Sequence, residues 1–203
     1  MDYLGSRSLA VTEPCHLSRR SLCLGLFGLV AGVNPAAAGP YLAYAEGLAA
    51  HPPKGSRYRP DLEAELVDLL NAYRAGKGKA PVQADAAFQQ AARAHAADMM
   101  LNGFMGHSSS TGMSFQGRMA AFVGDVTKYP SIGENAARET VRDGSLAQKT
   151  RALFQQWVDS GPHRRNMVNR SFAFVSTGVI ERDGDIWAVQ IFFATPRAKG
   201  IFQ

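Results

Sequence analysis

Apolar residues recur at intervals of three or four in four stretches of the chain, the spacing that places them on one face of a helix. The stretches cover about residues 62–76, 85–103, 114–122 and 146–157. In the first stretch acidic residues come early and Arg74 comes near the end, the charge order that the helix dipole favours. Trp157 completes the apolar face of the fourth stretch, and Gly161 and Pro162 end the pattern. We therefore expect four helices, each with one buried face.

Two runs of β-branched and aromatic residues near the C-terminus predict strands over residues 172–181 and 186–194. Asp183 and Gly184 lie between the runs and favour a tight hairpin turn. Helices that come first and an antiparallel hairpin that comes last predict an α+β domain, in which helices cover a sheet.

The first 38 residues have the organisation of a secretory signal peptide. Arg19 and Arg20 precede an apolar run over residues 21–33, and small residues lead up to Ala38, after which we expect cleavage. The run is shorter than the roughly 20 apolar residues that a transmembrane helix needs. We therefore expect a protein exported to the periplasm or the extracellular space, without a transmembrane anchor. The paired arginines fit both a general secretory signal and a twin-arginine signal.

Residues 39–60 are rich in Gly, Pro and Tyr and show no sustained period, so we expect an extended leader before the folded domain. We predict the domain over residues 61–195 and a C-terminal tail over residues 196–203. Both cysteines, Cys15 and Cys23, lie in the predicted signal peptide. The exported chain would therefore contain no disulfide and would depend on packing for its stability.

The composition is typical of one globular domain. The 203 residues are 46% hydrophobic, which is enough for one core. The formal net charge of +5 is spread along the chain, without the basic runs or the basic–aromatic alternation of nucleic-acid-binding proteins. We expect a monomer that binds neither nucleic acid nor an anionic membrane surface.

Three histidines and one glutamate are the candidates for chemistry. His95 lies on the apolar face of its predicted helix, where an imidazole that makes one hydrogen bond in the core is the usual case. His107 lies in a polar loop and His163 at a helix end, and an exposed or capping role explains each of them alone better than a ligand role does. Glu134 alone could cap a following helix. Two imidazoles and one carboxylate together are the usual ligands of an open divalent metal site.

Four segments taken together resemble the secreted CAP superfamily, also called SCP-like, and within it the bacterial branch without disulfides. The superfamily takes in cysteine-rich secretory proteins, antigen 5 and plant pathogenesis-related proteins. The segments are "LLNAYRAGKGKAPVQADAAFQQAARAHAADMMLNGFMGHSS", "IGENAARE", "QQWVDSGPHRRNMVN" and "TGVIERDGDIWAVQIFFA". The resemblance covers about residues 61–194, and it implies an α-β-α sandwich with a large central cavity.

The resemblance also implies a set of site residues. In the family two histidines and two glutamates meet in the cavity and can bind zinc or another divalent cation. Three of these positions fall on His107, Glu134 and His163, whereas we place the fourth, a glutamate, at Ala152. The missing carboxylate would weaken metal binding or leave the site empty.

Several other matching positions are expected to be scaffold. Asn71 and Arg74 would bond neighbouring loops, and Trp157 and Trp187 would pack in the core.

The function that these observations favour is that of a binding module. Its cavity, which would include Ser108 and Asn135 beside the three site residues, would receive a small molecule, a lipid or a cell-wall fragment. A metal- or serine-dependent hydrolase is the alternative, with Ser108, Ser109 or Ser131 as the nucleophile. Because the sequence contains no nucleophile elbow, an enzyme is the less favoured class. A surface interaction protein with an inert cavity is the third.

Overall fold

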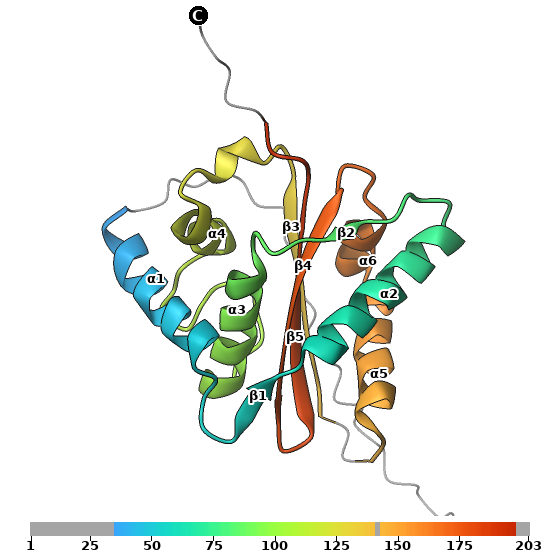
Figure 1. Ribbon diagram of the computed structural model, residues 1–203, viewed down its shortest axis with the longest axis horizontal. Helices are drawn as coiled ribbons and strands as arrows, with labels where there is room; N and C mark the ends of the chain where they lie inside the picture. Colours follow the sequence, from blue (N-terminus) through green and yellow to red (C-terminus); the bar gives the residue numbers. More distant parts are fainter. Residues whose placement is uncertain (1–34, 141–142, 198–203) are drawn as a thin grey trace, which may run out of the picture.

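A five-stranded sheet divides the helices into two layers (Figure 1). The structure, a computed structural model, describes residues 35–140 and 143–197. On one side of the sheet lie α1 (Pro35–Ala50), α3 (Gln89–Asn102) and α4 (Phe115–Val123). On the other side lie α2 (Pro60–Gly76), α5 (Leu146–Asp159) and α6 (Gly161–Val168). The expected α+β sandwich is confirmed.

The sheet is built around the expected C-terminal hairpin. Its strands are β1 (Ser56–Tyr58), β2 (Gln83–Ala84), β3 (Ile132–Glu139), β4 (Phe174–Arg182) and β5 (Asp185–Phe193). The strand order is β1-β4-β5-β3, and the short β2 runs parallel to β4 along the outer edge of β4. Asp183 and Gly184 both have a positive φ, as a tight hairpin turn requires. A 3₁₀ turn, η1 (Val126–Lys128), precedes β3.

The two faces of the sheet form two separate cores. Val189 and Ile191 of β5 pack against the layer of α1, α3 and α4, whereas Ala188 and Phe192 pack against the layer of α2, α5 and α6. Alternate residues of a strand point to opposite faces, so β5 supplies both cores. Gly178 of β4 lies directly against the backbone of α3, where a Cβ atom would collide with Arg93. Helix α3 therefore packs directly against β4.

The predicted extended leader is wrong for most of its length. Residues up to Ala50 belong to helix α1, and Ser56–Tyr58 pairs with β4 as strand β1. Gly and Pro in this segment suggested breaks, but Tyr41, Ala45 and Leu48 lie on one helical face and are buried against α3 and α4. This burial outweighs the weak local preference. Cleavage after Ala38 stays a prediction, and most of the predicted signal peptide lies outside the described residues.

Two further elements differ from what the sequence predicts. The segment around Glu134 is strand β3, paired with β5 from Ile132 to Glu139, and Glu134 does not cap a helix. The strand is buried on both faces, so it lacks the alternation that would identify it. Gly161 and Pro162 end α5 but also begin α6, where proline is well tolerated in the first turn.

Candidate functional site

Four elements bring the candidate side chains together. His107 lies in the loop between α3 and α4, Arg118 lies on α4, Glu134 on β3 and His163 on α6. Asp98 of α3 fixes this loop. Its carboxylate accepts hydrogen bonds from the backbone N–H and the hydroxyl of Ser110 at 2.9 and 2.5 Å. We call His95, His107, Arg118, Glu134 and His163 the polar cluster.

Glu134 and Arg118 form a buried ion pair at the centre of the polar cluster. Nη2 of Arg118 donates to both carboxylate oxygens of Glu134, at 2.8 and 2.7 Å, and both side chains are almost completely buried. Burial by itself would raise the pKa of Glu134, but Arg118, His95 and His107 outweigh it and hold the pKa at about 2. Glu134 is therefore ionised at neutral pH.

The ionised carboxylate fixes the ring of His107. Nδ1 of His107 lies 2.8 Å from Oε1 of Glu134, and an ionised carboxylate only accepts hydrogen bonds, so Nδ1 carries the proton. Nε of Arg118 donates to the backbone carbonyl of His107 at 3.0 Å. The His107 side chain retains 9% of its surface, against 1% for Glu134 and none for Arg118. His107 is therefore the member of this trio that solvent reaches.

His163 approaches the same place from the other layer. Its ring centroid lies 6.4 Å from that of His107, with the two rings nearly perpendicular. His163 is fully buried, and its backbone carbonyl accepts a hydrogen bond from Asn135 at 3.2 Å. Asn166 of the same helix donates to the Glu134 carbonyl at 3.1 Å and to the Asn135 side chain at 2.9 Å. These bonds hold α6 against β3 and set the position of His163.

His95 is a core histidine, as the sequence indicates, and it also borders the polar cluster. It is 1% exposed and its Nε2 lies 2.8 Å from the Gly106 carbonyl, which accepts the bond. Burial and then the charge of Arg118 lower the pKa of His95 to about 4. His95 is therefore neutral at pH 7, and its Nε2, 3.9 Å from Glu134, adds a dipole but no charge.

Arg118 is the residue that sequence reasoning missed. It lies one helical turn from Phe115 and next to Met119 on a short helix, so its side chain faces inward among buried neighbours. A cation on a buried face requires a buried anion. The position of Arg118 on the apolar face of α4 was therefore the available signal for such a pair. Tyr41 of α1 lies beside it, and burial raises the pKa of the Tyr41 hydroxyl although Arg118 opposes that effect.

Three sequence-predicted positions lie away from the polar cluster or play another part. Ser108 follows His107 in the loop and is exposed. Asn135 is fully buried and acts as a brace between β3 and α6. Ala152 lies on the exposed face of α5, whereas the polar cluster is buried. The placement of the missing family glutamate at Ala152 is therefore wrong, because a side chain at this position faces solvent.

The expected scaffold residues hold the roles that the sequence assigns to them. Asn71 exchanges two hydrogen bonds with the backbone of Val82, and Arg74 donates to the carbonyls of Ala80, Met167 and Asn169. Trp157 and Trp187 are buried in the two cores.

The polar cluster does not fit a divalent cation. Among residues 35–140 and 143–197 no group of three or more His, Cys, Asp or Glu side chains could hold a metal ion. Arg118 is a separate argument against a cation, because it bonds both oxygens of Glu134 and would repel a cation placed there. The zinc site stays a prediction, and the residues around Glu134 argue against it.

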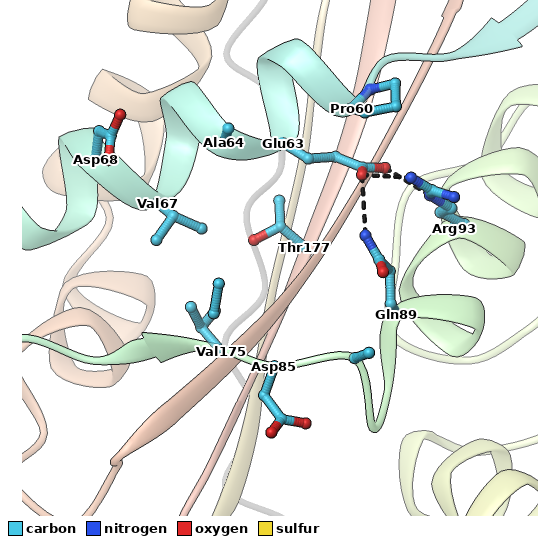
Figure 2. A pocket seen from close by; sticks show the side chains of 12 residues that line it. Pro60, Glu63, Ala64, Val67, Asp68, Asp85, Gln89, Arg93, Val175 and Thr177 are labelled. Carbon is cyan, nitrogen blue, oxygen red and sulfur yellow. Dashed lines mark hydrogen bonds and ion pairs between the residues drawn. The ribbon is translucent and has the colours of Figure 1, made fainter.

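Two pockets in the described part of the chain lie away from the polar cluster. The first, of about 480 Å³, lies between α2, the segment before α3 and β4 (Figure 2). The second, of about 440 Å³, lies between the end of α2 and the start of β4. His107, Glu134 and His163 line neither of them.

Comparison with known proteins agrees with this architecture. The family model of the cysteine-rich secretory protein family, CAP, matches residues 67–192. YkwD of Bacillus subtilis is 33% identical over 129 residues, which are 63% of this chain and 46% of that protein. The match therefore spans less than half the length of this relative.

Solved structures show the same fold. An extracellular protein of Bacillus anthracis that contains an SCP domain superimposes with a TM-score of 0.54 and 24% identity, over 66% of this chain and 41% of that one. An outer surface protein of Borrelia burgdorferi superimposes with a TM-score of 0.57 and 13% identity, over 68% of this chain and 98% of that one.

Proposed function

Because the chain belongs to the cysteine-rich secretory protein family, CAP, we propose that it is an exported binding protein whose ligand contacts the polar cluster through His107. The similar protein of Bacillus anthracis is extracellular, which supports export. In the described part of the chain no helix has the length and apolar character needed to cross a membrane. We propose release into the periplasm or the extracellular space as a monomer.

The observation that carries the proposal is the support behind one partly exposed imidazole. His107 is held through Nδ1 by Glu134, and Glu134 is held in turn by Arg118. A side chain fixed in this way loses little freedom when a ligand binds, so the contact costs little entropy. The ligand class is a small molecule, a lipid or a cell-wall fragment.

The observations favour binding over hydrolysis. A hydrolase would need a nucleophile that one of the imidazoles activates. The hydroxyl of Ser109 is bonded to Thr111 and to the backbone N–H of Met113, at 2.8 and 2.9 Å, which is a loop-stabilising role. Ser108 is exposed and Ser131 bonds Ala194 through its backbone, so neither shows the features of an activated serine.

Native mass spectrometry of protein purified from its own host tests this function. We expect an additional bound mass that His107→Ala abolishes. The matched control is His51→Ala, which removes an exposed histidine far from the polar cluster in sequence and should keep the bound mass. A bound mass that both variants retain, or none in repeated preparations, would contradict the proposal.

A further inference from the structure

The first pocket lies at a gap in the strand pairing along the outer edge of the sheet. Strand β1 covers one end of the β4 edge, pairing with residues 180–182, and β2 covers the other end, pairing with residues 174–175. Thr177 lies between these two partners and lines the pocket (Figure 2). Among the described residues, a short stretch of β4 therefore has no strand beside it on this edge.

The backbone of Thr177 faces this opening. Two residues to either side, the carbonyl of Val175 accepts the N–H of Asp85, and the carbonyl of Val179 accepts the N–H of Arg59, both at 3.0 Å. In an antiparallel strand every second residue directs its N–H and C=O to the same side. The N–H and C=O of Thr177 therefore point outward as well. No hydrogen bond within the described ranges satisfies them on that side.

The side-chain hydroxyl of Thr177 also lacks a hydrogen-bond partner among the described residues. Thr177 is 5% exposed, and its hydroxyl has no hydrogen-bond partner among residues 35–140 and 143–197. Figure 2 shows this oxygen pointing into the space between Val67 and Val175, two residues that line the pocket. A buried hydroxyl without a partner costs free energy, and a bound polar group would recover part of it. The pocket thus offers three polar groups that no described residue bonds, above an apolar wall.

The rim of the pocket is acidic although the whole chain carries +5. Glu63 is neutralised by Arg93, which donates to both of its oxygens at 2.7 and 2.6 Å. Asp68 and Asp85 are exposed, and in the described part of the chain neither forms an ion pair. The two carboxylates leave the lining with a net negative charge.

We propose that this pocket binds an extended peptide segment that carries a basic side chain. The peptide backbone pairs with the outward N–H and C=O of Thr177, as an added strand does at an open sheet edge. The alkyl part of the basic side chain lies on Val67 and Val175, and its charged end lies near Asp68 and Asp85. This site is separate from the polar cluster and does not depend on the function proposed for His107.

The test uses a capped pentapeptide, acetyl-Ala-Val-Lys-Val-Ala-amide, titrated into the protein and followed by amide NMR and calorimetry. We expect the Thr177 amide to shift and its hydrogen exchange to slow on binding. The same peptide with glutamate in place of lysine should have an affinity at least about tenfold lower, because the substitution places a negative charge near two carboxylates. Equal affinity for both peptides, or an unchanged Thr177 amide, would overturn the proposal.

Matched variants locate the site. Ala64→Trp fills the pocket from the exposed side of α2 and should abolish binding, whereas Ala72→Trp, on an exposed position of the same helix outside the lining, should leave it intact. Asp68→Asn should weaken binding roughly threefold, the size expected for an exposed charge pair, and Asp159→Asn on α5 should not. His107→Ala should leave peptide affinity unchanged. Equal effects within either matched pair would count against this site.

Discussion

The polar cluster and the pocket at the β4 edge are two polar regions that differ in how their groups are satisfied. In the polar cluster the buried charge of Glu134 is matched by Arg118 and by His107. At the edge, Thr177 presents a hydroxyl and two backbone groups that no described residue satisfies, beside carboxylates without counter-ions in the same ranges. Loss of a partner should therefore destabilise the first region, whereas in the second region removal of a polar group should stabilise the fold.

The largest effect is expected from Arg118→Met. The substitution removes the cation but leaves Glu134 buried, and an uncompensated buried charge costs about 3–5 kcal/mol. Urea denaturation at pH 7 should show the free energy of unfolding reduced by that amount. The double variant Arg118→Met with Glu134→Gln should recover a large part of the loss, because the remaining group is neutral. A double variant no more stable than the single one would show that the ion pair is not the reason.

Acid should destabilise the fold through the same region. The pKa of His95 is about 4 when folded and about 6.5 in an unperturbed chain, so between these values the unfolded chain binds a proton that the folded chain does not. Stability therefore falls as the pH falls from 6.5 to 4, by roughly 3 kcal/mol. Glu134, with a pKa of about 2 against 4.5, adds a loss below pH 4.5.

Unfolding free energies measured from pH 7 to pH 4.5 test this assignment. His95→Gln keeps a donor for the Gly106 carbonyl but cannot titrate, so its stability should depend much less on pH over this range. If the wild-type protein and His95→Gln lose stability in parallel, the source lies in other groups.

The contrast between the regions also explains what the sequence could predict. Helices α2, α3 and α5 have one buried face and their periodicity identifies them, whereas β3 is buried on both faces and has no such pattern. Helix α1 contains Gly39 and Pro40 and is held by its contacts with α3 and α4, which no local signal reports.

Long-range pairing limited the prediction of the site in the same way. Family resemblance selected His107, Glu134 and His163, which do approach one another, but it assigned no role to Arg118. The partner of a buried charge is a long-range contact, so only the inward position of Arg118 on α4 could have indicated it. The missing family glutamate was wrongly placed at Ala152 for the same reason, since the exposure of Ala152 on α5 depends on how that helix packs.

At the β4 edge, Thr177→Val should raise stability by about 1 kcal/mol, because it removes a buried hydroxyl that no described residue bonds and keeps the shape of the side chain. Thr150→Val is the matched control. Thr150 is also buried, but its hydroxyl donates to the Leu146 carbonyl at 2.9 Å, so this substitution should not stabilise the fold. Thermal unfolding of both variants checks the sign. If Thr177→Val destabilises the fold as much as Thr150→Val does, the hydroxyl of Thr177 has a partner.

The smallest effect is expected from zinc. A ligand raises the melting temperature only when it binds the folded state, and the guanidinium of Arg118 occupies both oxygens that Glu134 could offer to a cation. Excess zinc should therefore shift the melting temperature of the wild-type protein by less than about 1 °C, which corresponds to a few tenths of a kcal/mol. Arg118→Gln removes the competing charge and leaves His107, Glu134 and His163 in place, so this variant should be stabilised by zinc more than the wild-type protein is. A clear zinc-dependent rise in the melting temperature of the wild-type protein that His107→Ala abolishes would show that Arg118 moves away from Glu134. The ion pair would then open when a cation binds and would not be a fixed part of the core.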